Sequence, residues 1–199
     1  MSEGPNLAAL LDALDGHAVD YLVAGSVAAM ALGAPDVSPA DLDVIPATVP
    51  GNLERLAAAL DAVGATTGAT YGEWGTDEAG EREWVQDGRL RPARPLDPED
   101  EATFDHSFES PHGRLDVVPV VAGAYEELRP RAVRVRVAGA ERWVAAPLDL
   151  LAGMTRPRRP KDGRRVRHLW SLAVAGWSPN IDEECAGGRD LATASPSYA

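Results

Sequence analysis

Hydrophobic residues recur at helical spacing in several segments of the 199-residue chain. In residues 6–14, leucines stand at positions 7, 10, 11 and 14, the i, i+3, i+4, i+7 spacing that is typical of an amphipathic helix. Helices are also predicted over residues 26–32, 52–64, 147–154 and 161–174. Ser26 and Asn52 are the expected N-caps of the second and third helices, because short polar side chains accept hydrogen bonds from free backbone N–H groups.

Shorter apolar or alternating runs predict strands between these helices. They cover residues 21–24, 41–45, 104–110, 114–121 and 133–137, and Trp143-Val144 begins another. Residues 111–113 (Pro-His-Gly) join two of them into a hairpin, and residues 125–128 end a short helix. Helices and strands interleave early and a hairpin follows. The pattern therefore favours an α+β fold, with a mixed β-sheet flanked by helices and a C-terminal helical segment.

We expect one domain over residues 1–178. Residues 66–103 are rich in glycine, proline and charge, which predicts a long loop, an insertion or a lid with one strand near residues 83–86. Residues 179–199 are polar and rich in small side chains, which predicts a disordered tail.

The formal net charge is −12 at pH 7, and a uniformly acidic surface would repel nucleic acid. The charge is uneven, however, because residues 155–168 (TRPRRPKDGRRVRH) contain seven Arg or Lys and one Asp. A polyanion is therefore expected to bind near residues 156–167, unless these residues form a solvated helix face. No apolar run is long enough to cross a bilayer, and the acidic N-terminal segment has no signal-peptide pattern. The single cysteine excludes an intrachain disulfide and fits a cytoplasmic location.

Two aspartates, Asp41 and Asp43, interrupt an apolar strand. Residues i and i+2 of a strand point to the same face, so both carboxylates project together while Leu42 and Val44 face the core. Adjacent carboxylates raise each other's pKa, and a divalent cation between them removes the repulsion. The alternative is that both aspartates lie on the solvent face of an edge strand.

Asp116 lies in another apolar strand (GRLDVVP) and is a candidate third carboxylate. Three aspartates on neighbouring strands can hold two metal ions about 3.5–4 Å apart, the arrangement that serves phosphoryl or nucleotidyl displacement. Mg²⁺ is the expected ion, because it binds one or two carboxylates together with substrate phosphates.

Gly25-Ser26 stands at the predicted junction of a strand and a helix. Such a junction directs free backbone N–H groups and the positive end of the helix dipole at one point. Glycine lets a phosphate approach the backbone, and the serine hydroxyl can donate a further hydrogen bond. A plain helix cap is the alternative. The chain has no GxxxxGK[ST] motif, so a P-loop is excluded.

In their order along the chain, AGSVAAMALGAP, DLDV and GRLDVVP resemble the DNA polymerase β-like nucleotidyltransferase superfamily. The segment PLDLLAGMTRPRRPKD resembles the leucine-rich helix and R-x-K-D of small bacterial nucleotidyltransferases of toxin–antitoxin and abortive-infection type. The resemblance implies a mixed β-sheet flanked by helices. It also implies Mg²⁺-dependent transfer of a nucleoside monophosphate from an NTP to a hydroxyl acceptor.

The resemblance implies a role for each candidate residue. Asp41 and Asp43 would bind both metal ions, and Asp116 would bind the catalytic metal and help to activate the acceptor hydroxyl. Gly25 and Ser26 would hold the triphosphate. Lys161, together with Arg159, would neutralise phosphate charge, so these four are the expected nucleotide-binding residues.

One position departs from the family pattern. Small bacterial members often carry an arginine shortly before the D-x-D strand, where this chain has Asp36. An acidic residue there weakens triphosphate binding unless it points away. The alternative function is therefore a catalytically inactive nucleotide-binding or regulatory protein of the same fold.

The acceptor stays open among RNA, protein and small molecules. An RNA or small-molecule acceptor is expected near the basic residues 156–167, and an antitoxin is a candidate protein partner. A polycationic, aminoglycoside-like acceptor is a third reading, which requires carboxylates between Asp97 and Asp105 to bind it.

Overall fold

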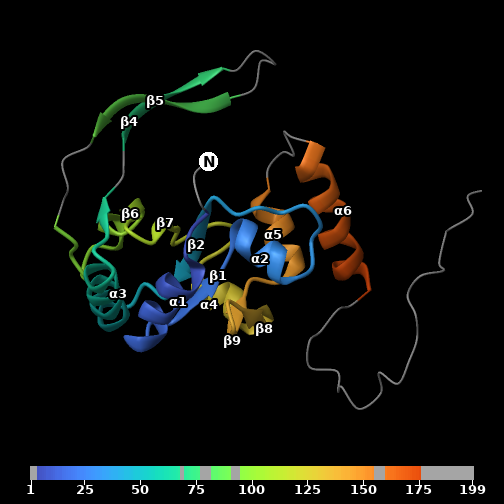
Figure 1. Cartoon of the computed structure of the whole chain (residues 1–199), viewed down its shortest axis with the longest axis horizontal. Coiled ribbons are helices and arrows are strands. Elements are labelled where there is room, and N and C mark those ends of the chain that lie inside the picture. The colour runs from blue at the N-terminus through green and yellow to red at the C-terminus, as the bar shows by residue number, and fades with distance from the viewer. Residues whose placement is uncertain (1–3, 68–69, 77–81, 91–94, 155–159, 176–199) are drawn as a thin grey trace, which may run out of the picture.

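The computed structural model describes residues 4–67, 70–76, 82–90, 95–154 and 160–175 (Figure 1). The helices are α1 (Leu7–Gly16), α2 (Gly25–Ala31), α3 (Pro50–Ala62), α4 (Tyr125–Leu128), α5 (Pro147–Gly153) and α6 (Pro160–Val174). Two 3-10 turns are η1 (Glu101–Thr103) and η2 (Arg129–Arg131). The strands are β1 (Tyr21–Val23), β2 (Asp41–Pro46), β3 (Thr66–Thr67), β4 (Thr70–Thr76), β5 (Arg82–Leu90), β6 (Ser107–Ser110), β7 (Gly113–Val117), β8 (Val133–Val137) and β9 (Ala140–Val144).

Seven strands form one mixed sheet in the order β3-β6-β7-β2-β1-β9-β8. The pairs β2–β7 and β1–β9 are parallel, and the remaining neighbours are antiparallel. This arrangement confirms the predicted α+β fold with a mixed sheet flanked by helices. Because β1 and β2 are antiparallel, the end of β1 lies beside the beginning of β2 (Figure 1).

The alternation of side chains along the strands divides the sheet into two apolar faces. On one face, Leu42, Val44 and Leu115 pack against the leucines of α1 and α3 in the main core. On the other face, Leu22 and Ile45 pack in a smaller cluster with Leu128 of α4. The second face is therefore covered over β1 and the end of β2, and the beginning of β2 lies beyond that cluster.

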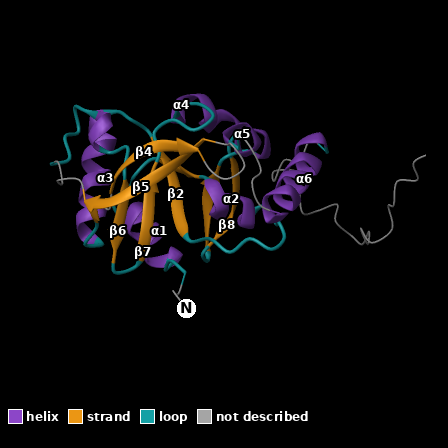
Figure 2. Cartoon of the chain, turned by 90° about the horizontal axis from the view of Figure 1, so that it is seen from above, coloured by secondary structure: helices purple, strands orange, loops and turns teal. Residues whose placement is uncertain are grey.

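The prediction for residues 66–103 was wrong in its strand count. β3 joins the main sheet by pairing with β6, and β4 and β5 form a separate two-stranded hairpin. The hairpin lies on the side of the sheet opposite α1 and α3, and seen from above it crosses in front of β6, β7 and β2 (Figure 2). Glycine in both strands weakens the period-two signal, which explains why the sequence pattern missed this hairpin.

Two expected helix caps were also wrong. α2 begins at Gly25 with Ala24 as its N-cap, so Ser26 lies inside the first turn. α3 begins at Pro50 with Val49 as its N-cap. Asn52 is instead fully buried, and its amide bonds the backbone of Asp20 and of Ala47 at 2.7–2.9 Å. It therefore ties the turn before β1 to the turn after β2.

Apart from one, the remaining strand predictions hold: β8 has the predicted bounds, β2 is one residue longer than predicted, and β1, β6 and β7 are shorter. The strand expected to begin at Trp143 runs from Ala140 to Val144 and so ends there, as the second strand of a hairpin with β8. The predicted tail 179–199 lies outside the described residues. None of the helices that the structure describes is long and apolar enough to cross a membrane.

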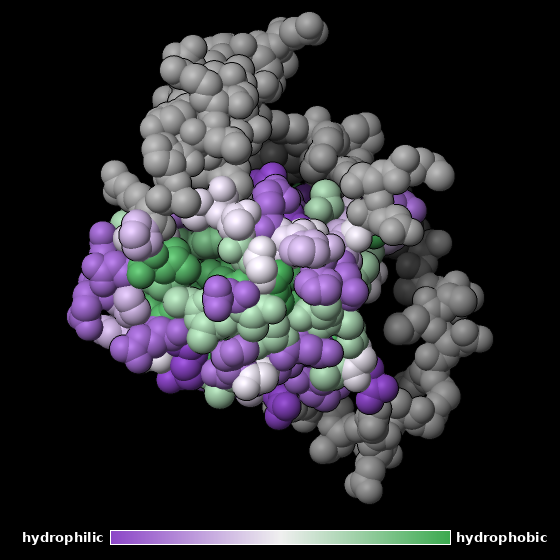
Figure 3. All heavy atoms as spheres, turned by 60° about the vertical axis from the view of Figure 1, so that its left-hand side comes forward, coloured by the Kyte–Doolittle hydropathy of each residue, from purple (hydrophilic) through white to green (hydrophobic). Residues whose placement is uncertain are grey.

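The face on the α3 side of the molecule is mostly hydrophilic around a patch of hydrophobic residues (Figure 3). Apolar atoms make up much of the surface of any folded protein, so a patch of this kind is an ordinary feature. The side of the sheet that carries Asp41 and Asp43 is chemically more distinctive.

Candidate active site

Asp41 and Asp43 lie at the beginning of β2, on the face away from the main core. Both are partly exposed, whereas Leu42 and Val44 are fully buried, as the D-x-D spacing predicts. The parallel register of β2 and β7 places Asp43 directly beside Asp116. All three predicted carboxylates therefore share one face of two adjacent strands.

Asp116 is held by an arginine from its own strand. Arg114 Nε donates to Asp116 Oδ1 at 2.8 Å, and the Arg114 guanidinium also donates to Ser107 Oγ on β6 at 2.6 Å. The register places Arg114 beside Asp41, so a positive charge stands among the three carboxylates. No sequence motif singled out this arginine, although its position two residues before Asp116 puts it on the same strand face.

Gly25 is in direct contact with Asp43. A Cβ atom on residue 25 would lie 1.8 Å from Asp43 Oδ2, and φ of Gly25 is +57°, a conformation that favours glycine. The backbone N–H of Ser26 donates a hydrogen bond to the Asp43 carboxylate. The Gly25-Ser26 pair and the D-x-D strand, which are separate motifs in the sequence, thus form one structural unit.

The carboxylates perturb one another. Burial, followed by the charges of Asp41 and Asp116, raises the pKa of Asp43 to about 6, and the bond from Ser26 opposes this shift. Burial and the charge of Asp116 also raise the pKa of Asp41, which Arg114 partly offsets. A group whose pKa is raised by burial and by neighbouring like charges is a candidate for a functional site.

Within the described ranges, no three His, Cys, Asp or Glu side chains lie close enough together to hold a metal ion. The three aspartates share a face but do not converge on one point, and the bond from Arg114 orients the Asp116 carboxylate. The donor set still suits Mg²⁺, because carboxylate oxygens are hard ligands. Burial and mutual repulsion raise the pKa of both Asp41 and Asp43, and a bound cation would offset that repulsion.

Ser26 carries an unsatisfied hydroxyl. Its Oγ is buried and has no hydrogen-bond partner within the part of the chain that the structure describes. Buried polar atoms are nearly always paired, and this hydroxyl next to Gly25, unpaired among the described residues, can donate to a group that binds there. A phosphate oxygen is chemically suited to accept this bond.

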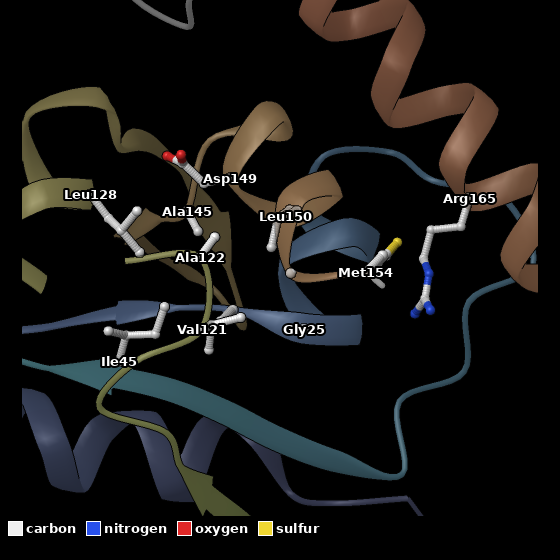
Figure 4. A pocket seen from close by; sticks show the side chains of 12 residues that line it. Gly25, Ile45, Val121, Ala122, Leu128, Ala145, Asp149, Leu150, Met154 and Arg165 are labelled. Atoms are coloured by element: carbon white, nitrogen blue, oxygen red, sulfur yellow. The ribbon is translucent and has the colours of Figure 1, made fainter. Parts of the chain in front are cut away.

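A pocket of about 130 Å³ opens on the other side of Gly25 (Figure 4). Its wall is mainly apolar, with Asp149 and Arg165 as the charged residues, and is formed by Ala24, Gly25, Ile45, Val121, Ala122, Leu128, Ala145, Asp149, Leu150, Gly153, Met154 and Arg165. Gly25 thus separates the carboxylates from an apolar slot that α5, α6 and the segment after β7 enclose.

Sequence analysis did not identify the two charged residues of this pocket. Asp149 is buried, and its carboxylate accepts from Arg131 Nη2 at 2.9 Å. Arg165 follows Lys161 by one helical turn, so the basic segment carried a signal for it. Neither position could be linked to Gly25 without the fold, because more than a hundred residues separate them in the chain.

The two basic residues predicted to bind nucleotide are placed only in part. Lys161 lies in the first turn of α6, where the structure describes the backbone alone, and Arg159 lies outside the described residues. Asp36, which stands where an arginine was expected, forms an ion pair with Arg164 of α6 at 3.0 Å. The unexpected negative charge is therefore offset by the helix that carries the basic segment.

No protein-family model matches the chain, and no curated protein matches its sequence. Among solved structures, the chain is similar to the antibiotic-resistance factor ANT(2'')-Ia, an aminoglycoside nucleotidyltransferase known from a solution structure. The TM-score is 0.54 at 14% sequence identity, over 86% of this chain and 84% of that chain. At this identity the likeness concerns the fold alone. The seven-stranded mixed sheet and its flanking helices accordingly match the nucleotidyltransferase fold.

Proposed function

We propose that the protein is an Mg²⁺-dependent nucleotidyltransferase that moves a nucleoside monophosphate from an NTP to a hydroxyl acceptor. The main support is the placement of Asp43 beside Asp116 in register and against Gly25. The alternative explanation of the D-x-D motif was an edge strand with both aspartates on its solvent face. It does not apply, because β2 lies inside the sheet between β7 and β1.

Each residue has a chemical task in this proposal. Asp41 and Asp43 would hold Mg²⁺, which offsets the negative charge of the triphosphate when it is bound, and Asp116, whose carboxylate is oriented by Arg114, would act on the acceptor. The Ser26 hydroxyl would donate to a phosphate oxygen near Gly25. The acceptor oxygen forms a bond to the α-phosphorus, the bond from that phosphorus to the bridging oxygen breaks, and pyrophosphate leaves. Asp116 Oδ2, the oxygen that does not accept from Arg114 Nε, would take the acceptor's proton.

Thermal unfolding with ATP, GTP, CTP and UTP, each with and without Mg²⁺, tests the donor site. An NTP at 100 times its Kd adds about 2.7 kcal/mol to the free energy of unfolding. For a chain of this size the melting temperature should rise by about 5–10 °C. We expect at least one NTP to produce this shift only with Mg²⁺, and the shift should be lost in Asp43→Asn.

The matched control is Asp61→Asn, which changes an exposed aspartate on α3 and should keep the shift. An equal shift in Asp43→Asn and wild type would contradict the proposed metal ligand. The absence of a Mg²⁺-dependent shift with every NTP would favour a regulatory protein that does not use this site for catalysis.

The surroundings of the site favour a cationic small molecule as the acceptor. The segment before β6 carries exposed carboxylates, namely Asp97, Glu99, Asp100, Glu101 and Asp105. It leads into Ser107, which pairs in register with Asp116, so Asp105 at the end of this segment is only two residues from the strand position beside the proposed acceptor base. A negatively charged approach attracts polycations and repels RNA. The likeness to an aminoglycoside nucleotidyltransferase in fold agrees with this choice.

Neutralising part of this segment should weaken the use of a cationic acceptor. The variant Glu99→Gln/Glu101→Gln/Asp105→Asn should lower kcat/KM for an aminoglycoside about tenfold at low salt, and less at high salt, because exposed charges are screened. The readout is transfer of label from an NTP to aminoglycosides or to short RNAs. A triple control, Glu54→Gln/Asp61→Asn/Glu141→Gln, removes equal charge from exposed sites elsewhere. Labelling of RNA but of no aminoglycoside would contradict the assignment.

A further inference from the structure

The pocket beside Gly25 differs from the carboxylate site in its chemistry. Its volume of about 130 Å³ is below the range of about 300–1,000 Å³ for drug-sized ligands, so it suits a single ring system. Apolar side chains of Ile45, Leu128, Leu150 and Met154 supply most of the wall. Such a slot favours a flat, weakly hydrated group over a sugar or a phosphate.

The charged residues stand at different ends of this slot. Asp149 lies with Leu128 and Ala145 at one end, and Arg165 lies beyond Met154 at the other (Figure 4). Gly25 lines the pocket and also lies directly against the Asp43 side chain. The slot is therefore lined both by Asp149 and by a residue that borders the carboxylate site.

We propose that this slot binds the nucleobase of the donor nucleotide and that Asp149 selects bases carrying an exocyclic amino group. The inference rests on the proposed nucleotidyltransferase function and names the base that the donor carries. The amino group of such a base donates an N–H···O hydrogen bond to a carboxylate. A carbonyl oxygen at the same ring position can only accept hydrogen bonds, so it is repelled by the carboxylate oxygens.

The hydrogen bonding of Asp149 leaves room for this contact. Arg131 donates to Asp149 Oδ1 at 2.9 Å, and its Nε lies 3.3 Å from each carboxylate oxygen. An ionised carboxylate offers about four lone-pair sites, so Oδ2, with one long bond, can accept another donor. The Arg131 guanidinium also compensates the negative charge of this buried carboxylate, because the two side chains form an ion pair.

The test measures binding of nucleosides without phosphate or metal, by NMR titration in EDTA at pH 7.5. Two ligand pairs differ in the exocyclic amino group: adenosine against purine riboside, which lacks it, and cytidine against uridine, which has a carbonyl in its place and a proton on the adjacent ring nitrogen. We expect the amino-bearing member of each pair to bind about tenfold more tightly, because a site built to accept a hydrogen bond rejects the ligand that lacks the donor. In Asp149→Asn the preference should fall to within about threefold, since asparagine can also donate to a carbonyl.

Arg131→Lys is the matched control, because it changes the partner of Asp149 and keeps both the compensating positive charge and the carboxylate. It should retain most of the preference. Equal binding within both ligand pairs in the wild type, or equal loss of preference in both variants, would overturn the role of Asp149. Binding of Mg²⁺ with inorganic tripolyphosphate is measured in parallel. If tripolyphosphate binds and no nucleoside does, the base slot is refuted while the proposed nucleotidyltransferase function stands.

Discussion

Replacing Asp43 with asparagine should make the metal-free protein more stable above pH 6 than the wild type. The pKa of Asp43 is about 6 in the folded protein, against 3.8 for an unperturbed aspartate. Between these values the folded state binds more protons than the unfolded state, so the free energy of unfolding falls as the pH rises. A difference of about two pKa units corresponds to about 3 kcal/mol, which is lost from the wild type between about pH 4 and pH 6.

The asparagine side chain does not titrate and is nearly isosteric with aspartate, so the Asp43→Asn variant should not show this loss. Urea unfolding in EDTA at one-unit steps from pH 4 to pH 8 gives the difference between variant and wild type at each pH. That difference should grow by about 3 kcal/mol, and the titrations of groups far from Asp43 cancel in it. Asp61→Asn on α3, which packs on the face of the sheet opposite Asp43, controls for the loss of a negative charge. A stability difference that does not change with pH would mean that folding does not raise the pKa of Asp43.

The carboxylate geometry could be predicted because it depends on local periodicity. Asp41 and Asp43 had to share a face once the segment was a strand, and Leu42 and Val44 had to face the core. The pairing of Asp43 with Asp116 is a matter of register between distant strands, for which the family resemblance was the only guide. The contact between Asp43 and Gly25 depends on how β1 ends beside β2, which local periodicity does not specify.

The misplaced features share a different cause. Asn52 has a good cap side chain, but three backbone partners from two turns outcompete the local role. Arg114 was given no role from the sequence, and the pairing of β6 with β7 brings Ser107 within reach of it. Asp149 and Arg165 lie at different ends of a pocket that α5, α6 and the segment after β7 form together. In each case tertiary contacts that local sequence does not specify decided the role of the residue.

Gly25→Ala should disable the site with a smaller effect on the fold. The new Cβ would lie 1.8 Å from Asp43 Oδ2 and 2.5 Å from its Cγ, so the Asp43 side chain has to leave its position. The φ of +57° adds about 1–2 kcal/mol of backbone strain for alanine. A displacement of about 1 Å in a reacting site costs on the order of 100-fold in rate. We therefore expect the Mg²⁺-dependent NTP shift to disappear, with a loss of about 1–3 kcal/mol in the free energy of unfolding.

A double-mutant cycle separates the clash from the backbone strain. In an Asp43→Ala background the carboxyl group is absent, so Gly25→Ala should cost less stability there than in the wild type, by an amount that measures the contact. Gly51→Ala on α3 is the control, since a Cβ at that position meets no atom within 4 Å and should leave the NTP shift unchanged. Equal costs in both backgrounds would show that Gly25 is required for its backbone conformation alone. In that case the fit of glycine to Asp43 could no longer support their common role at the phosphate, and the Ser26 hydroxyl would remain as the independent support for it.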